Sequence, residues 1–355
     1  MSKVDTFCLD EDIKCIADAL GEVAAKFSDK HLVITGGMGF LGRYFTRTIE
    51  YLNENVFENP CRITCVDNFI TAGDFGSNYD SSKVNFIRHD VSKPIEFNEK
   101  IDYIIHAAGI ASPYYYRMYP LETLDVAING TRNMLELARE HNCRLLFMSS
   151  SEIYGDPDDK HVPTQESYNG NVSPLGARAC YDESKRVGET LCQIYASKFN
   201  THTNIARPFN VYGPGMQEKD YRVLPNFASR IKSGKSLKIY GQGSQTRTFC
   251  YITDAINGFL RILALGNPGE PYNIGNAKPE VSMLELSEII KKSISRDISV
   301  DVVEYPDSYP ADEPQRRCPD LTKSNIQLQY TPAIGLEDGL KRFFTWAMDV
   351  YKGDM

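Results

Sequence analysis

The chain has 355 residues, of which 42% are hydrophobic and 24% charged, an ordinary composition for a globular protein. Its formal net charge is −8 and it has no run of lysines and arginines, which argues against a nucleic-acid partner. Its nine cysteines are dispersed without zinc-ligand spacing, so we predict no metal, no disulfide framework and a reducing, cytoplasmic setting.

Short apolar segments alternate with longer helical ones over the first two-thirds of the chain. We predict helices at about 10–27, 40–55 and 121–141 and from 181 onward, and strands at 31–37, 61–69, 84–90, 101–109, 144–151 and 203–213. This alternation is typical of a parallel sheet covered by helices on both faces. The predicted fold class is therefore α/β, with a doubly wound Rossmann sheet.

The same pattern predicts three parts. Residues 1–30 form a helical extension, to which the sequence assigns no role and which has no apolar run for a signal peptide or membrane span. Residues 31–213 form the Rossmann domain, and a segment near 238–262 returns to it. Residues 214–355, richer in proline and glycine, mainly form a smaller, discontinuous lobe for the substrate.

A glycine-rich turn follows the first strand, where TGGMGFLG contains Gly36, Gly39 and Gly42. Glycines at this spacing permit a tight turn and let a pyrophosphate approach the amides at a helix N-terminus. Asp67 ends the second strand, where a carboxylate accepts a hydrogen bond from the adenosine ribose and repels a 2′-phosphate. The pattern predicts bound NAD rather than NADP.

Tyr181 and Lys185 are four residues apart, a spacing that places both side chains on one face of a helix. A neighbouring positive charge favours the phenolate, so such a pair suits general-base catalysis. Taken alone, however, Tyr-x-x-x-Lys is more often an ordinary surface turn, and the rest of the chain has to decide.

Five ordered motifs resemble the extended short-chain dehydrogenase/reductase family: TGGMGFLG, HAAG, SSSEIYG, YDESK and RPFNVYGP. The resemblance implies a nucleotide-sugar substrate, Tyr181 as the base for a sugar hydroxyl, and Lys185 as the group that lowers the pKa of Tyr181 and holds the nicotinamide ribose. RACYDESKR and GSQTRTF are similar to the UDP-glucuronate decarboxylases of that family. That similarity implies oxidation at C4, loss of CO2 and re-reduction to UDP-xylose.

By the same resemblance, Ser150 hydrogen-bonds the reacting hydroxyl, and Glu152 positions a water or the sugar ring. The implied cofactor-binding residues are Gly36, Gly39, Phe40, Leu41, Asp67, Asn68, Asp90, Val91, Ala107, Ala108, Lys185 and Arg207. The implied substrate-binding residues are Tyr116, Arg178 (for the uronate carboxylate), Asn210, Arg222, Arg247 and Arg317. Arginine suits these roles because its planar fork binds phosphate or carboxylate bidentately.

One departure keeps other activities open. The subgroup usually has Ser-Pro-Ala-Ser-Pro-Pro where this chain has GIASPYYY at 109–116, and Ile110 and Tyr114 could indicate another sugar. A 4-epimerase, or a dehydratase or C4 dehydrogenase for another UDP-, GDP- or dTDP-hexose or heptose, is the alternative, although a dehydratase would need a carboxylate at Ser151. A non-catalytic NAD-binding regulator is a remote alternative. Relatives pair two helices per subunit, which implies a homodimer through about 120–140 and 181–199.

Overall fold

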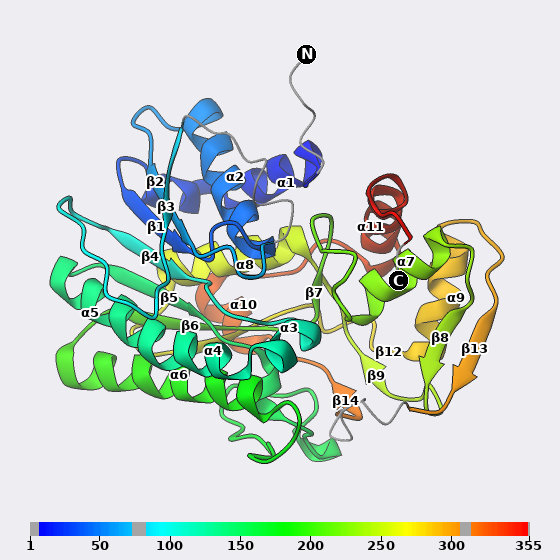
Figure 1. Ribbon diagram of the computed structural model, residues 1–355. Helices are drawn as coiled ribbons and strands as arrows, with labels where there is room; N and C mark the ends of the chain where they lie inside the picture. Colours follow the sequence, from blue (N-terminus) through cyan, green and yellow to red (C-terminus); the bar gives the residue numbers. More distant parts are fainter. Residues whose placement is uncertain (1–6, 73–82, 306–313, 354–355) are drawn as a thin grey trace.

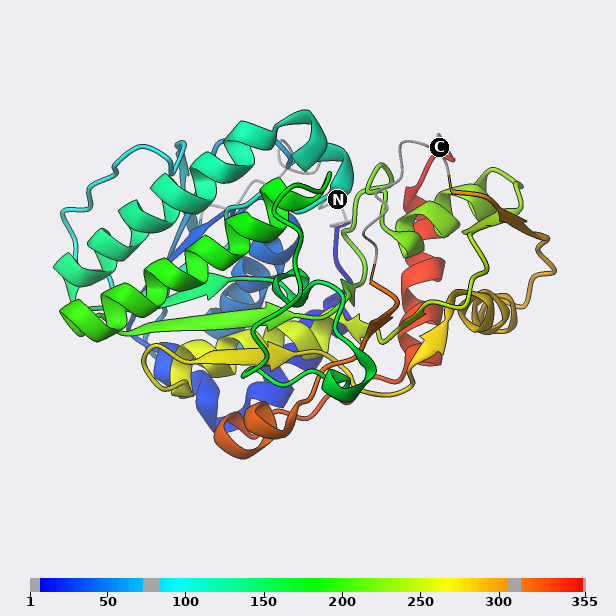
Figure 2. The ribbon, with the colours of Figure 1, turned by 90° about the horizontal axis from the view of Figure 1, so that it is seen from below.

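A computed structural model describes residues 7–72, 83–305 and 314–353. Its centre is a seven-stranded parallel sheet in the order β11-β6-β5-β4-β1-β2-β3 (Figures 1 and 2). The strands are β1 (His31–Thr35), β2 (Arg62–Asp67), β3 (Val84–Arg88), β4 (Tyr103–His106), β5 (Arg144–Met148), β6 (Thr203–Pro208) and β11 (Pro271–Ile274). The predicted doubly wound α/β fold is confirmed, and the strand order reverses between β1 and β4.

Helices cover both faces of this sheet, so alternate residues of one strand enter different cores. In β1, Leu32 and Ile34 pack into one core, whereas Val33 packs into the other. The first core is covered by α1 (Asp10–Leu20), the 3-10 helix η1 (Gly21–Phe27), α2 (Phe40–Asn55) and α8 (Ile252–Leu265). The second is covered by α5 (Thr131–His141) and α6 (Ala179–Phe199). Strands buried on both faces explain the continuous apolar runs in the sequence.

The smaller lobe lies beyond the carboxyl ends of the sheet strands, on the right in Figure 1. Its helices are α7 (Val223–Lys232), α9 (Met283–Ser293) and α11 (Leu336–Val350). Its strands are β8 (Leu237–Tyr240), β13 (Val300–Val303), β9 (Thr246–Arg247), β12 (Val281–Ser282) and β14 (Arg316–Arg317), while β7 (Val211–Tyr212) pairs with β10 (Cys250–Tyr251). The three-part division stays a prediction, but α8, β11 and α10 (Thr322–Leu328) bring later segments onto the central sheet.

Two predicted elements are divided in the structure. The helix expected at 121–141 consists of α4 (Pro120–Asp125), a π-helical turn η3 (Val126–Gly130) and α5. The strand expected at 203–213 is interrupted at Asn210, whose positive φ of 42° turns the chain between β6 and β7. Three further short helices are α3 (Pro113–Met118), η4 (Ser151–Tyr154) and η5 (Asp159–His161). None of the described helices combines the length and hydropathy of a membrane span.

Candidate active site

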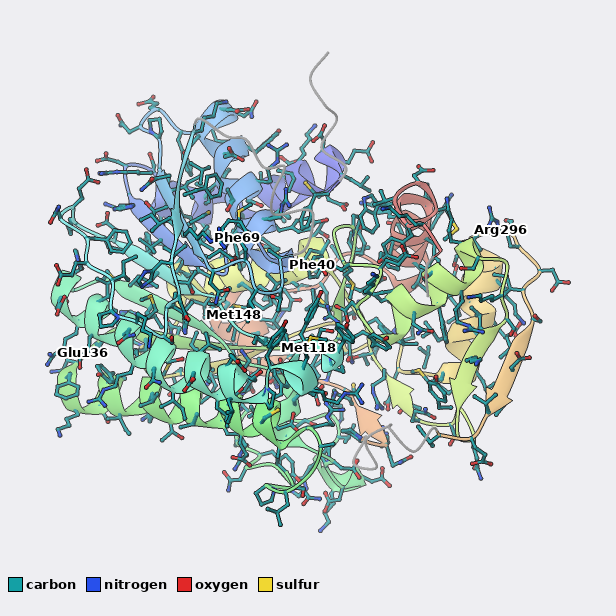
Figure 3. All side chains as sticks on the ribbon, in the orientation of Figure 1. Phe40, Phe69, Met118, Glu136, Met148 and Arg296 are labelled. Carbon is teal, nitrogen blue, oxygen red and sulfur yellow. The ribbon has the colours of Figure 1, made fainter. Side chains whose placement is uncertain are left out.

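A cavity of about 690 Å³ lies at the carboxyl ends of β1, β2, β4 and β5, and the smaller lobe forms its other wall. Figure 3 shows Phe40, Met118 and Met148 in this central region, while Glu136 and Arg296 lie at opposite ends of the molecule. Doubly wound folds bind ligands at this edge of the sheet, where the strand order reverses. All predicted site residues except Arg207 line the cavity.

Tyr181 and Lys185 both lie on α6 and are buried in the wall of the cavity. The Lys185 ammonium donates a hydrogen bond to the Met148 carbonyl oxygen at 2.9 Å and lies 5.7 Å from the centre of the Tyr181 ring. Burial lowers the pKa of Lys185 to about 8. Burial also raises the pKa of Tyr181 to about 12, although a hydrogen bond with Ser150 opposes this rise. The buried phenol is therefore a proton donor at neutral pH unless further positive charge enters the site.

Ser150 and Glu152 lie where β5 gives way to η4. The Ser150 hydroxyl oxygen accepts a hydrogen bond from the Glu152 amide at 3.2 Å. The Glu152 carboxylate forms ion pairs with Arg178 and with Arg317, whose Nη2 lies 2.8 Å from Oε2. Burial would raise the pKa of Glu152, but these two arginines and Arg247 outweigh it and lower the pKa to about 2. Glu152 is thus a carboxylate throughout the physiological range.

Arg222 and Arg247 approach the cavity from the smaller lobe, and Asn210 from the turn between β6 and β7. The Arg247 guanidinium donates hydrogen bonds to the carbonyl oxygens of Thr246 at 2.8 Å and Pro314 at 2.6 Å. Arg222 pairs with Asp220, with 3.0 Å between Nε and Oδ1. The Asn210 side-chain amide donates to a backbone carbonyl at 2.7 Å, which ties the turn after β6 to the segment before β10.

The cofactor half of the cavity has a shape that only glycine permits at Gly36. Its φ is 67°, and a Cβ atom there would lie 2.8 Å from the Ala107 carbonyl carbon. Asp67, at the end of β2, accepts hydrogen bonds from the Met38 amide at 2.9 Å and the Phe69 amide at 2.8 Å. A Cβ atom at Gly109 would lie 3.1 Å from the Lys185 ammonium, so this glycine leaves the lysine open to the cavity. These features fit a dinucleotide.

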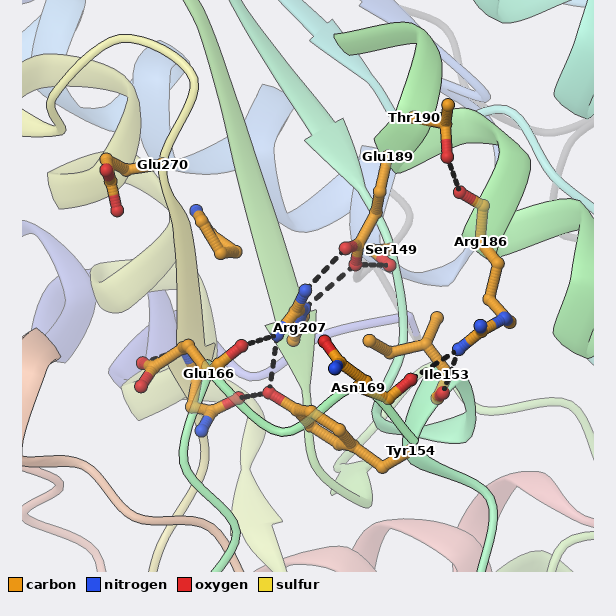
Figure 4. Close-up of polar contacts among 12 residues, drawn as sticks. Ser149, Ile153, Tyr154, Glu166, Asn169, Arg186, Glu189, Thr190, Arg207 and Glu270 are labelled. Carbon is orange, nitrogen blue, oxygen red and sulfur yellow. Dashed lines mark hydrogen bonds and ion pairs between the residues drawn. The ribbon is translucent and has the colours of Figure 1, made fainter. Parts of the chain in front are cut away.

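Arg207 is the exception among the predicted residues, because it does not line the cavity and its side chain is held by the polar contacts drawn in Figure 4. Its guanidinium pairs with Glu189, at 2.9 Å from Nε to Oε1 and 2.6 Å from Nη2 to Oε2. Nη1 donates to the Tyr154 hydroxyl and to the Glu166 carbonyl oxygen, both at 2.8 Å. Four of its five guanidinium N–H groups are used in these bonds and the residue does not line the cavity, so we expect no direct contact between Arg207 and the cofactor.

Phe7 of the N-terminal extension also forms part of the cavity wall, although no sequence motif points to it. Phe7 is buried, its ring lies 4.4 Å from the Arg43 guanidinium carbon, and a Cβ atom at Gly215 would lie 2.6 Å from that ring. No sequence motif predicts this contact, because it joins segments that are far apart in the chain. Within the described residues there is no group of three or more side chains suited to hold a metal ion.

Comparisons with known proteins agree with this geometry. The family described as "NAD dependent epimerase/dehydratase family" matches residues 32–275. UDP-glucuronic acid decarboxylase 1 of Xenopus tropicalis is 38% identical over 315 residues, which cover 88% of this chain and 71% of the relative. UDP-glucuronic acid decarboxylase 5 of Arabidopsis thaliana is 39% identical over 319 residues, 88% of each chain. The structure of UDP-glucuronic acid 4-epimerase from Bacillus cereus with UDP-glucuronic acid and NAD is 26% identical, with a TM-score of 0.74 over 90% of this chain and 100% of that one.

Proposed function

The chain belongs to the NAD dependent epimerase/dehydratase family, and from this premise we propose that it is a UDP-glucuronate decarboxylase that uses NAD. The reaction converts UDP-glucuronate to UDP-xylose and CO2. The observation that carries the proposal is the Glu152 carboxylate, which two arginines hold beside Tyr181, Lys185 and Ser150 in a chain 38–39% identical to such decarboxylases.

The charge of the site suits a substrate with a uronate carboxylate and a diphosphate. Three guanidinium groups, those of Arg178, Arg247 and Arg317, act on one ionised carboxylate, that of Glu152. Burial and the nearby Glu152 raise the pKa of Asp182 to about 7, so its carboxyl compensates these cations only in part. The surplus positive charge favours an anionic ligand, which arginine forks bind bidentately.

Each residue has a place in a balanced sequence of steps. When bound, NAD brings a positively charged nicotinamide that favours the Tyr181 phenolate, accepts a hydride from C4 of the sugar and returns it at the end. Tyr181 takes the proton of the C4 hydroxyl as C4 becomes a ketone. The bond from C5 to the carboxylate then breaks, its electron pair passes into the C5–C4 enolate, and CO2 leaves.

The hydroxyl groups of Tyr181 and Ser150 stabilise the negative charge on the C4 oxygen of this enolate. Glu152, ionised and fixed by its arginines, accepts a hydrogen bond from the water that delivers a proton to C5. Bulk water returns a proton to the hydroxide left behind, so each CO2 released consumes one proton from the solvent. Tyr181 finally returns its proton to the C4 oxygen as the ketone is reduced. In this scheme Glu152 orients the water and does not itself supply a proton, because its pKa is about 2.

A second candidate is 4-epimerisation of UDP-glucuronate. The Bacillus cereus epimerase carries UDP-glucuronic acid in its complex and shares the fold of this chain. An epimerase needs the same C4 oxidation by Tyr181 and Lys185, but its product retains the carboxylate. The keto sugar rotates in the site, so that the hydride returns to the opposite face of C4. The two reactions therefore differ in whether the mass of CO2 is lost.

Mass spectrometry of purified protein incubated with UDP-glucuronate tests the proposal. We expect a product lighter by the mass of CO2 without added reductant, and no product with Tyr181→Phe. A product of unchanged mass that separates from UDP-glucuronate by chromatography would establish the epimerase instead. No change at all, in protein shown to contain NAD, would exclude both reactions and direct attention to other nucleotide sugars.

We also propose a homodimer in a reducing, cytoplasmic compartment. All nine cysteines lie in the described part of the chain, and none of them is half of a disulfide there. The helices α4 and η3 pack against α6. Apolar side chains on these helices are exposed to solvent: Leu121 is 71%, Ile128 42% and Ile194 43% exposed. Sedimentation velocity of the wild type and of Leu121→Glu tests this contact, and a wild-type monomer would contradict it.

A further inference from the structure

The helix α6 presents three residues, four positions apart, to three consecutive residues at the end of β5. The Ser150 side chain lies close enough to Tyr181 to lower the pKa of its phenol, and the Lys185 ammonium donates to the Met148 carbonyl oxygen at 2.9 Å. One turn further, the Ser149 hydroxyl donates to Glu189 Oε1 at 2.5 Å. Residues i, i+4 and i+8 lie on one helix face, so a single face of α6 holds the whole segment 148–150.

Glu189 is the one member of this row that faces away from the cavity. Its carboxylate is held bidentately by Arg207 of β6, and the two side chains are 13% and 8% exposed. Arg207 is itself fixed by Tyr154 of η4 and the Glu166 carbonyl oxygen. Figure 4 shows this network behind the strand end, with Glu189 between Ser149 and Arg207.

The network extends to the next strand of the sheet. The Tyr154 hydroxyl accepts from Arg207 and donates to the Asn273 side-chain oxygen of β11 at 2.7 Å. Arg207 thus joins α6, η4 and two neighbouring sheet strands. Such a buried ion pair adds little net stability, because desolvation offsets the attraction between the charges, but it holds a fixed geometry.

We propose that Glu189, held by Arg207, is a positioning residue that fixes the 148–150 segment against α6, so that the Tyr181, Ser150 and Lys185 side chains meet the substrate together. The roles of those three residues rest on the proposed function. Their mutual placement does not, because the contacts exist in the protein alone.

A purely structural role is the competing explanation, in which the ion pair only ties α6 to β6. Ser149→Ala separates the two explanations, because it removes the link to the strand end and leaves Glu189 and Arg207 paired. Thr190→Ala is the matched control. It removes a hydroxyl at the adjacent position of α6, which donates a hydrogen bond to the Arg186 carbonyl oxygen at 3.1 Å.

With Ser149→Ala we expect kcat to fall about tenfold, while KM stays within about twofold and the melting temperature within a few degrees. Glu189→Gln should lower kcat at least as much, and the double variant should be no worse than Glu189→Gln alone, because both changes break the same bond. Thr190→Ala should leave kcat unchanged in the wild type, and it should cause no further loss when combined with Ser149→Ala.

Hydrogen exchange of peptides that cover 148–153 tests the same inference without turnover. The Glu152 amide donates to the Ser150 side chain, so we expect it to exchange several-fold faster in Ser149→Ala and at the wild-type rate in Thr190→Ala. Unchanged exchange together with unchanged kcat in Ser149→Ala would overturn the inference, as would a lower melting temperature with normal kcat. If wild-type protein does not convert UDP-glucuronate, the proposed function fails, and the exchange result alone decides the positioning role.

Discussion

The ring of Tyr116 is stacked on the ring of Tyr181, with centroids 5.3 Å apart and ring planes inclined by 14°. Tyr116 belongs to α3, within the 109–116 segment that departs from the decarboxylase pattern, and it is only 2% exposed. The stack restricts rotation of the Tyr181 ring, so this departure bears on the orientation of the catalytic phenol as well as on the sugar.

Replacing Tyr116 with leucine should therefore lower kcat for UDP-glucuronate by about tenfold, because the stacked partner of Tyr181 is lost. The smaller side chain also leaves a void that we expect to lower the free energy of unfolding by about 2–4 kcal/mol. Steady-state kinetics and urea denaturation measure the two effects.

Tyr116→Phe is the matched control, since it keeps the ring and removes only the hydroxyl. We expect kcat within about twofold of the wild type for this variant. A loss as large as that of Tyr116→Leu would show that the hydroxyl, and not the stack, is what the reaction needs.

Glu152→Gln should abolish decarboxylation. It should also lower the free energy of unfolding at neutral pH, because the arginines around Glu152 lose their carboxylate partner. The folded-state pKa of Glu152, about 2, lies below its ordinary value of 4.5, so the ionised group stabilises the fold fully above pH 4.5. That contribution, about 3 kcal/mol by linkage, is lost as the pH falls toward 2. In urea denaturation, the difference in the free energy of unfolding between the wild type and Glu152→Gln should become smaller as the pH falls from 7 to 3.

If this difference in the free energy of unfolding stays constant over the range, Glu152 does not titrate with a depressed pKa. Added sulfate gives a second readout, because an anion can replace the lost carboxylate between Arg178 and Arg317. We expect sulfate to raise the stability of Glu152→Gln more than that of the wild type.

The sequence predicts the framework of the site well, for a simple physical reason. The motifs follow apolar runs, such as His31–Thr35, that become buried parallel strands. Carboxyl ends of parallel strands share one edge of a sheet, so Gly36, Asp67, Ala107 and Ser150 meet although they are far apart in the chain. Spacing on α6 then brings Tyr181 and Lys185 to that edge.

Contacts between elements are not predictable in this way. Arg207 lies in a strand buried on both faces, and the sequence does not tell on which side its guanidinium finds a partner. Its pairing with Glu189 depends on how α6 packs against β6. The contact of Phe7 with the 213–217 turn and the stack of Tyr116 on Tyr181 likewise join segments that no local pattern relates.

Lys185→Met should be more stable than the wild type at neutral pH, by about 2–3 kcal/mol. The folded-state pKa of Lys185, about 8, lies below the ordinary value of 10.5, so the fold carries the cost of a buried charge below pH 8. Between these pH values the unfolded chain binds more protons, and the wild type gains stability as the pH rises. The advantage of Lys185→Met, measured by urea denaturation, should therefore shrink from pH 7 to pH 9.5.

Lys160→Met is the control, because that side chain is 81% exposed and should show no such pH dependence. An advantage of Lys185→Met that does not change with pH would contradict a depressed lysine pKa. It would leave better packing of the methionine as the explanation.

Asp12→Ala tests whether the N-terminal extension belongs to the fold. Asp12 is fully buried on α1, and its carboxylate accepts hydrogen bonds from the Tyr251 hydroxyl at 2.7 Å and from Arg342 of α11 at 3.1 Å. The substitution leaves the Tyr251 hydroxyl without this acceptor, so we expect the free energy of unfolding to fall by about 3 kcal/mol. Trp346, one turn after Arg342, gives a fluorescence signal for urea denaturation.

Asp12→Asn should lose less, because the amide keeps one oxygen acceptor for Tyr251. Asp18→Ala, on the exposed face of the same helix, should change stability by no more than about 0.5 kcal/mol. Equal effects of Asp12→Ala and Asp18→Ala would mean that α1 is not held through this carboxylate. The expected difference would instead establish that α1, which packs on α2 and α8 beside the sheet, is bonded through Asp12 to β10 and α11 of the smaller lobe.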